Sequence, residues 1–191
     1  ATVNDAILTL CGGALRLYLQ DKNELPEESL VAMAPVSTRT KDEEGTGGNQ
    51  VSQMTVSLRS DIEDPLERLQ AVYQSTSRSK ELTNAIGARL MTDYTQFIPS
   101  TTAALAARLA TRLHLADRIA PTFNCTVTNV PGPQIPLYSN GSRLVASYGL
   151  APILDGMGLI HCVFSYCGSI TVTATSCRKM MPDPAFYAQC L

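Results

Sequence analysis

The sequence contains few of the residues from which most active sites are built. It has no tryptophan and only two histidines, His114 and His161, and its six cysteines form no CxxC pair. Without closely spaced His and Cys ligands, a zinc site has no scaffold. No GxSxG is present, which argues against a serine hydrolase of the nucleophile-elbow type. The residues taken alone therefore predict no metal site and no self-sufficient active site.

Charge and long apolar runs are also limited. Charged residues make up 17% of the 191 positions, and the formal net charge is −2. This balance gives no electrostatic case for nucleic-acid binding. The apolar start of the chain is interrupted by Asn4, Asp5 and Arg16, and no run approaches the roughly 20 residues that span a bilayer. With 45% hydrophobic residues, we expect one folded domain over residues 1–191.

The cysteines and the first residue bear on where the protein works. Most cysteines lie inside apolar stretches, where a free thiol behaves as a small hydrophobe, and a chain of this length does not need a disulfide framework. We therefore expect reduced thiols and a cytoplasmic protein. The chain starts with Ala1 rather than Met. Either a leader was removed or the chain is the back part of a longer protein, and we favour the second explanation.

Apolar periodicity predicts helices and strands in alternation. The fold class expected from this mixture is an α/β (α+β) sandwich, in which helices pack on a mixed, partly antiparallel sheet. Thr2 or Asn4 is the expected N-cap of the first helix. Helices are predicted at 3–19, at 65–85 after Asp64-Pro65, at 101–119, and after Asp183-Pro184. Strands are predicted at 29–36 (ending near Pro35), 49–58, 123–130, 142–148 after the turn 139–141, and as a hairpin at 159–166 and 169–176.

Four local features have both a structural and a functional interpretation. Asn4-Asp5 matches a helix start, where Asn caps and Asp favours the helix dipole, and capping is the simpler explanation. In Asn129-Val130-Pro131-Gly132-Pro133 the prolines stiffen a turn that either closes the core or holds Asn129 against a ligand. The glycines at 46–50 lack the Lys-Ser/Thr of a phosphate-binding loop. His161 alternates along a strand, which favours a hydrogen-bonded structural histidine.

Six segments together resemble the C-terminal half of the bacterial wax ester synthase/diacylglycerol acyltransferase family. They occur in the family's order and extend over nearly the whole chain. The segments are ATVNDAIL at 1–8, VAMAPVSTR at 31–39, GGNQVSQM at 47–54, DPLERL at 64–69, TNVPGPQIPLY at 128–138 and LDGMGL at 154–159.

This resemblance implies one half of a chloramphenicol acetyltransferase-like, condensation-domain-like fold, with a tunnel between two similar halves. It implies transfer of an acyl group from acyl-coenzyme A, as substrate and without a cofactor, to diacylglycerol or a long-chain alcohol. The family's HHxxxDG motif, whose second His is the general base, lies in the N-terminal half. Here only Asp155-Gly156 matches its last two letters. The chain is therefore expected to be inactive alone.

The resemblance also assigns candidate site residues. The family's Asn-Asp motif falls on Asn4 and Asp5, and its NVPGP motif on 129–133. We expect Asn4, Asp5 and Asn129 to support an active site whose catalytic His comes from the N-terminal half. The expected tunnel and motif residues are Pro131, Gly132, Pro133, Asn49, Gln50, Asp155 and Gly156.

Two alternatives to the enzyme hypothesis stay open. One alternative is a non-catalytic lipid- or acyl-binding module. The other is a purely structural subunit, which has no residue in its favour. If a second half is needed, an apolar surface should be exposed, and residues 137–152 are the candidate. Contact with the inner membrane or lipid droplets is expected to involve the third helix, with Arg108, Arg112 and Arg118; a solvated helix face is the simpler interpretation.

Overall fold

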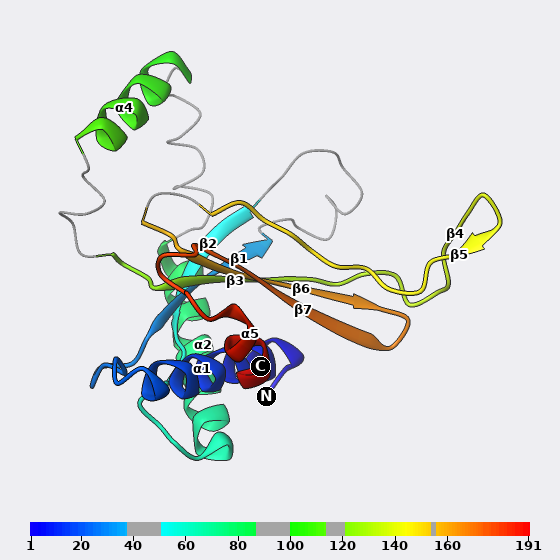
Figure 1. Cartoon of the computed structure of the whole chain (residues 1–191), viewed down its shortest axis with the longest axis horizontal. Helices are drawn as coiled ribbons and strands as arrows, with labels where there is room; N and C mark the ends of the chain where they lie inside the picture. The colour runs from blue at the N-terminus through cyan, green and yellow to red at the C-terminus, as the bar shows by residue number, and fades with distance from the viewer. Residues whose placement is uncertain (38–50, 87–99, 114–120, 154–155) are drawn as a thin grey trace.

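The computed structural model describes residues 1–37, 51–86, 100–113, 121–153 and 156–191. Its centre is a five-stranded sheet with the order β2-β1-β3-β6-β7 (Figure 1). The strands are β1 (Val31–Ser37), β2 (Val51–Ser57), β3 (Cys125–Val130), β6 (Leu159–Tyr166) and β7 (Ser169–Ser176). β1 and β3 pair in parallel, as do β3 and β6, while β2 and β7 pair antiparallel at the two edges. The predicted mixed sheet is confirmed.

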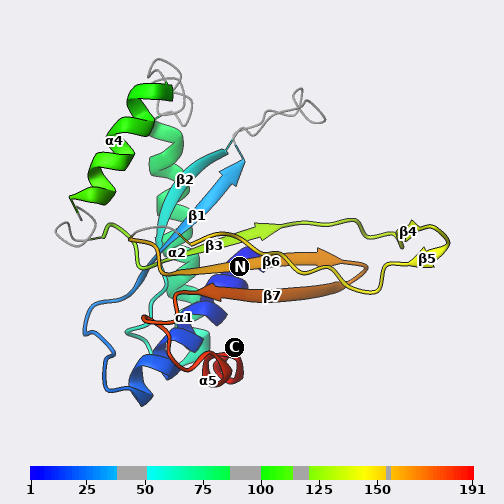
Figure 2. The same ribbon diagram turned by 45° about the horizontal axis from the view of Figure 1, so that its top comes forward.

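Three helices cover one face of this sheet (Figure 2). They are α1 (Val3–Asp21), α2 (Pro65–Ile86) and α5 (Pro184–Cys190). α2 begins as the sequence predicts, since one carboxylate oxygen of Asp64 accepts the backbone N–H groups of Leu66 and Glu67, each at 2.9 Å. At the start of α5, the Asp183 side chain accepts from the Phe186 N–H. The local capping signals therefore set both helix starts.

The core forms where the sheet-facing side of α1 meets the central strands. Leu8, Cys11 and Leu15 are at most 5% exposed and share one cluster with residues of β1, β2, β3 and β6. Burying a leucine of this kind contributes about 1.5–3 kcal/mol. The six cysteines are free thiols, as predicted, and burial raises the pKa of Cys11 and Cys125 to about 12.

His161 is part of this core. It is fully buried, and its Nε2 lies 2.6 Å from the hydroxyl oxygen of Tyr187 in α5. Burial lowers the pKa of the imidazole to about 4, so the ring is neutral at pH 7. The prediction of a hydrogen-bonded structural histidine is confirmed, and the pair joins α5 to the sheet.

Two predicted strands differ from the structure. β1 does not end near Pro35 but continues to Ser37; its pairing with β3 stops at Met33, so Pro35 lies where β1 has a single partner and a missing N–H is tolerated. The predicted strand 142–148 is wrong beyond its first two residues. Only β5 (Ser142–Arg143) pairs, with β4 (Tyr138–Ser139).

After β5, backbone carbonyls accept hydrogen bonds from side chains of β7 instead of from a paired strand. The Thr171 hydroxyl of β7 donates to the Ser147 carbonyl at 2.7 Å, and the Thr173 hydroxyl donates to the Gly149 carbonyl. A carbon added at Gly149 would lie 2.9 Å from Cβ of Cys162 in β6. This segment therefore lies against the face of β6 and β7 opposite to the helices. Side-chain hydroxyls take the place of a regular ladder, which periodicity cannot show.

The predicted turns are confirmed by their backbone angles. Asn140 and Gly141, between β4 and β5, have φ of 49° and 79°, and Cys167 and Gly168, between β6 and β7, have φ of 46° and 81°. Two consecutive positive φ values are what a two-residue hairpin turn requires.

The helix predicted at 101–119 corresponds to α4 (Ser100–Arg112), which stands apart from the sheet (Figure 1). It starts one residue before the predicted helix 101–119. The expected end, His114 and Arg118 lie outside the described residues.

Candidate functional site

The first turn of α1 is closed by a capping box between Thr2 and Asp5. The Asp5 N–H donates to the Thr2 hydroxyl oxygen, while Oδ2 of Asp5 accepts from the Thr2 backbone N–H at 2.6 Å and from the Thr2 hydroxyl at 2.8 Å. Thr2 is therefore the N-cap, and Asn4 is not needed for that role. The side chain of Asn4 takes no part in this capping box.

Asn4 and Asp5 lie on different faces of α1. At 100° per residue, Asn4 shares the sheet-facing stripe of Leu8, Cys11 and Leu15. Asp5 belongs to a second stripe, with Gly12 and Gly13, that faces α2 and the loop before it. This assignment follows from close approaches: a carbon added at Gly12 would lie 2.4 Å from the Leu58 carbonyl oxygen, and one at Gly13 2.3 Å from an Arg68 nitrogen.

The Asp5 carboxylate is enclosed between α1 and α2. The residue is 1% exposed, and its Oδ1 has no hydrogen-bond partner among the described residues. Burial opposes ionisation, but the hydrogen bonds from Thr2, together with the nearby Thr76 side chain and the charge of Lys80, lower the pKa of Asp5 below its ordinary value. Asp5 is therefore a buried anion on the side of α1 that faces α2.

Asn129 lies on the helix side of β3. Cys125 and Val127 point into the core below α1, and the ladder from β3 to β6 is continuous from Thr126 to Val130, so alternation places Asn129 on the same side. Asn4 and Asn129 are both half-buried. β3 runs from the C-terminal end of α1, where Cys125 and Leu15 line one cavity, towards its N-terminal end. The structure therefore brings Asn4 and Asn129 to the same end of the helix–sheet layer.

The turn after Asn129 is fixed to the β6–β7 hairpin. The Gly132 N–H donates to the Ser165 hydroxyl oxygen at 3.0 Å, and the Cys167 N–H donates to the Pro133 carbonyl at 3.2 Å. A carbon added at Gly132 would lie 2.1 Å from the Ser165 carbonyl oxygen, so only glycine fits there. Pro131 and Pro133 are exposed. The predicted rigid turn is confirmed, and Ser165, which the sequence did not single out, is its anchor.

The remaining predicted motif residues are not brought to this end. Asn49, Gln50 and Asp155 lie outside the described residues. Gly156 is exposed and precedes β6, which runs parallel to β3. Because Ile160 pairs with Thr126 and β6 runs parallel to β3, Gly156 lies before the start of β3, which is itself about 13 Å from Asn129 at the usual rise of a strand. Gly156 does not belong to the group formed by Asn4 and Asn129.

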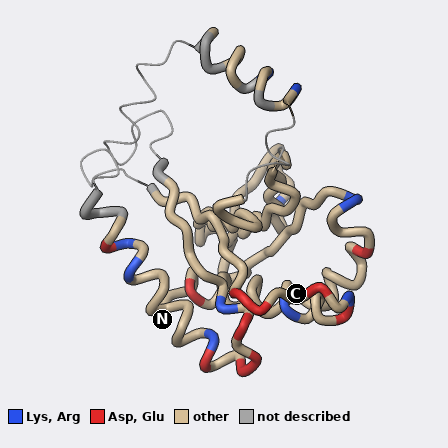
Figure 3. Tube along the Cα trace, turned by 90° about the vertical axis from the view of Figure 1, so that its left-hand side faces the viewer, with Lys and Arg blue, Asp and Glu red and all other residues tan. Residues whose placement is uncertain are grey.

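Charged groups are arranged around the sheet and not within it. The five strands contain no Lys, Arg, Asp or Glu, and the charged residues follow the helices and connections (Figure 3). Among the described residues, no His, Cys, Asp or Glu cluster is suited to a metal ion. The Asn4–Asn129 end therefore offers amide donors and acceptors. Two ionisable side chains nearby are buried, Asp5 on the side of α1 that faces α2 and His161 against the Tyr187 hydroxyl.

Residues 131–153, which we call the arm, project beyond the sheet at β4 and β5 and then return along β6 and β7 (Figure 1). Its apolar side chains are largely uncovered, which confirms the exposed apolar surface predicted at 137–152. Tyr166 holds the base of the arm, since its hydroxyl donates to the Leu144 carbonyl and accepts from the Leu137 N–H at 2.8 Å. Exposed fractions are 43% for Leu137, 66% for Tyr138, 38% for Leu144, 87% for Val145, 68% for Tyr148 and 82% for Leu150.

Asn4 and Asn129 therefore lie at one end of a two-layer α/β fold. Residues 47–191 match the WS/DGAT C-terminal domain family, and the chain belongs to this family. The wax ester synthase/diacylglycerol acyltransferase from Marinobacter aquaeolei VT8 superposes with a TM-score of 0.69 at 28% identity, covering 100% of this chain and 42% of that structure. The fold expected from the resemblance is confirmed.

Proteins of Mycobacterium tuberculosis are also similar to this chain. One named "Putative diacyglycerol O-acyltransferase" is 36% identical over 181 residues, and one named "Probable diacyglycerol O-acyltransferase tgs2" is 35% identical over 183. Each match covers 95% of this chain and 39% of the relative. The chain therefore spans about two fifths of the length of these relatives.

Proposed function

We propose that the chain is the C-terminal domain of an acyl-coenzyme A-dependent O-acyltransferase that esterifies diacylglycerol or a long-chain alcohol. The domain forms one wall of the acyl tunnel and part of the acceptor site. The observation that carries this proposal is the placement of Asn4 and Asn129 at one end of the helix–sheet layer. Family membership and the names of the relatives support the reaction class.

The chemistry requires a general base that this chain does not provide. In the proposed reaction a histidine of the N-terminal half takes the proton of the acceptor hydroxyl, whose oxygen attacks the thioester carbonyl of the acyl-coenzyme A. The carbon–sulfur bond breaks, and the coenzyme A thiol leaves with a proton. Acyl-coenzyme A is a substrate, and no cofactor takes part. Asn4 and Asn129 orient the acceptor hydroxyl or the histidine through amide hydrogen bonds.

Alanine substitutions in the full-length protein test the roles of the two asparagines. We expect Asn4→Ala and Asn129→Ala each to lower turnover at least tenfold, about 1.4 kcal/mol of transition-state stabilisation, with the melting temperature almost unchanged. Gln20→Ala removes an amide from the exposed surface at the other end of α1 and is the matched control. Normal turnover in both Asn variants would reduce these motifs to scaffold.

The same assay separates the enzyme from its alternative. With palmitoyl-coenzyme A and a long-chain alcohol, we expect turnover by the full-length protein and none by the 191-residue chain. Turnover by the chain alone would refute the need for a second half. Acyl-chain binding by the full-length protein without turnover would instead favour a non-catalytic lipid- or acyl-binding module.

We propose the N-terminal half of the same protein as the partner that covers the arm. Val145 and Leu150 are more than four fifths exposed, and seven large apolar side chains of the arm are exposed. Leu150→Glu in the full-length protein should lower both the melting temperature and turnover. Ile170→Glu, at a half-exposed position of β7 outside the arm, is the control. Equal effects of the two substitutions would contradict the docking role.

Peripheral contact with the inner membrane or lipid droplets, from the cytoplasmic side, is proposed for α4. Leu105, Leu109 and Leu113 recur every four residues and are 48–68% exposed, next to Arg108 and Arg112. No helix in the described residues is long and apolar enough to cross a bilayer. The full-length protein should float with anionic liposomes, and Leu109→Glu should return it to the soluble fraction. Flotation unaffected by this substitution, or no flotation, would contradict the contact.

A further inference from the structure

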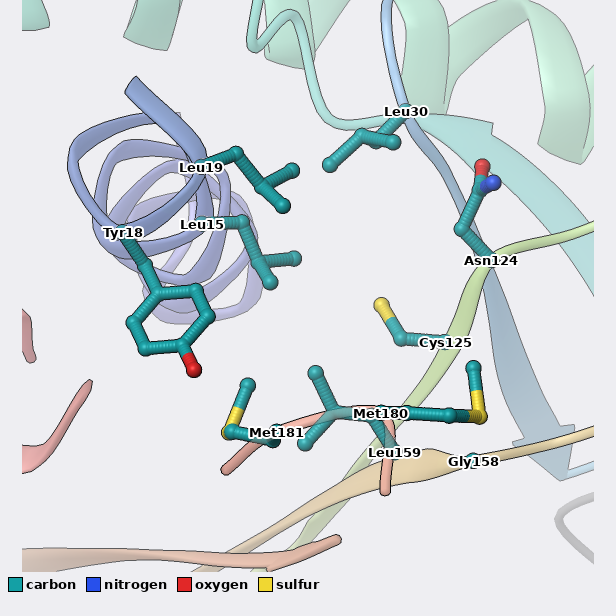
Figure 4. A pocket seen from close by; sticks show the side chains of 10 residues that line it. All are labelled: Leu15, Tyr18, Leu19, Leu30, Asn124, Cys125, Gly158, Leu159, Met180 and Met181. Carbon is teal, nitrogen blue, oxygen red and sulfur yellow. The ribbon is translucent and has the colours of Figure 1, made fainter. Parts of the chain in front are cut away.

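An apolar cavity lies at the end of α1 opposite to Asn4 (Figure 4). It has a volume of about 170 Å³. Leu15 and Leu19 of α1 point into it from one side, and Leu30 and Cys125 from the other. Leu15 is eleven residues from Asn4, about 16 Å along the helix. The cavity is therefore separate from the candidate site. The remaining lining residues are Tyr18, Asn124, Gly158, Leu159, Met180 and Met181.

The burial of the lining residues shows a closed base and an open mouth. Leu15, Cys125 and Met181 are at most 6% exposed, whereas Met180 is 66% exposed and Asn124 is also exposed. The Asn124 side-chain oxygen already accepts the Val31 N–H at 2.8 Å. Burial raises the pKa of the Cys125 thiol to about 12, so this thiol is neither charged nor reactive. The interior therefore offers apolar contact and no charge.

The size of the cavity fits a short length of hydrocarbon. An apolar protein cavity of about 150 Å³ holds benzene, which has six carbons, so about six carbons of an alkyl chain fit here. Methionine side chains adapt to the shape of such a chain, because they are unbranched and polarizable. Met180 and Met181 provide two of them, at the mouth and in the interior.

The mouth has positive charge next to it. Arg178 and Lys179 are exposed in the turn that carries the two methionines, and this turn is closed by the N–H groups of Met180 and Met181, which donate to the Cys177 carbonyl at 3.0 and 2.9 Å. We propose that the cavity binds the methyl end of an unbranched fatty acid, whose carboxylate lies at Arg178 and Lys179. This proposal does not depend on the function proposed for Asn4 and Asn129.

Octanoate is the probe for this site, because it has about six carbons for the cavity and a carboxylate for the mouth. In the full-length protein with ¹³C-methyl-labelled methionine, octanoate should shift the Met180 and Met181 methyl signals saturably. The Met54 signal, from the far edge of the sheet, should not move. Affinity should rise about fourfold per methylene from butanoate to octanoate and level off at decanoate. No saturable shift, or no dependence on chain length, would overturn the proposal.

A matched pair of Trp variants and one double Ala variant separate binding in the cavity from general binding to the surface. Leu19→Trp fills the cavity and should weaken octanoate binding at least tenfold, while Leu17→Trp, at a 54% exposed position of α1, should not. Leu30→Phe fills the cavity from the opposite wall and replaces Leu19→Trp if that variant does not fold. Replacing both Arg178 and Lys179 by Ala should weaken octanoate several-fold and leave 1-octanol unchanged. If Leu17→Trp weakened octanoate binding as much as Leu19→Trp, binding in the cavity would be refuted. If the double Ala variant weakened 1-octanol binding as much as octanoate binding, the contact between the carboxylate and Arg178 and Lys179 would be refuted.

Discussion

The helix-covered face of the sheet and the arm contain the same kinds of residue in opposite environments. Leu8 of α1 is fully buried among the central strands, whereas Leu150 of the arm is 82% exposed. On the covered face the apolar side chains of α1 pack against strands of the same chain. On the arm, the Thr171 and Thr173 hydroxyls of β7 donate hydrogen bonds to two backbone carbonyls, but the large apolar side chains remain exposed. Apolar composition alone therefore does not tell which residues build the core and which remain exposed on this chain.

The largest expected effect comes from one substitution made on both sides of this comparison. Leu8→Ala should destabilise the chain by about 3 kcal/mol, because it removes buried contacts and leaves a cavity. Leu150→Ala should change the free energy of unfolding by less than about 0.5 kcal/mol. Urea unfolding followed by circular dichroism measures both. Similar losses in the two variants would show that the arm is part of the core.

Lowering the pH should destabilise the helix-covered side of the sheet through protonation of His161. Its pKa is about 4 in the folded chain and about 6.5 in an unfolded one, so the unfolded state binds the proton more tightly. The stabilisation from the neutral ring is present above pH 6.5 and is lost as the pH falls towards 4. Between pH 7 and pH 5 this loss amounts to about 2 kcal/mol.

A histidine variant checks the source of this pH dependence. His161→Gln keeps a polar partner for the Tyr187 hydroxyl but does not titrate, so its urea midpoint should change little between pH 7 and pH 5. Asp5 does not contribute over this range, since its pKa lies below its ordinary value. A wild-type midpoint that is constant down to pH 5 would contradict the buried neutral histidine.

The smallest effect distinguishes two neighbours at the start of α1. Thr2→Ala removes the N-cap and should cost about 1 kcal/mol of stability. Asn4→Ala removes no cap and should leave the free energy of unfolding within about 0.5 kcal/mol of wild type. Thermal unfolding of the two variants side by side measures the difference. A larger loss for Asn4→Ala would return the capping role to Asn4 and weaken its place in the candidate site.

Local signals predicted most helices, turns and the hairpin. Asp64-Pro65 and Asp183-Pro184 begin helices through their own carboxylates, and Cys167-Gly168 turns the chain through its own φ angles. The candidate site was predicted only in part. The sequence pointed to Asn4, Asp5 and Asn129, but their separation into a sheet-facing pair and a buried anion depends on α2, which packs against one face of α1. Ser165 and Tyr166, which hold the turn and the arm, had no local signal.

The sequence by itself determined what neighbouring residues decide among themselves: the capping box of Thr2 and Asp5, the rigid turn at 131–133 and the apolar stripes of α1. The tertiary structure decided which stripe of α1 faces the sheet, that Pro35 remains in a strand, and that residues after Arg143 lie along β7 without a ladder. The physical reason is the separation along the chain of the residues that interact. Caps and turns are fixed by hydrogen bonds and sterics within a few residues, whereas burial depends on segments that are distant in the chain and meet only when the sheet has formed.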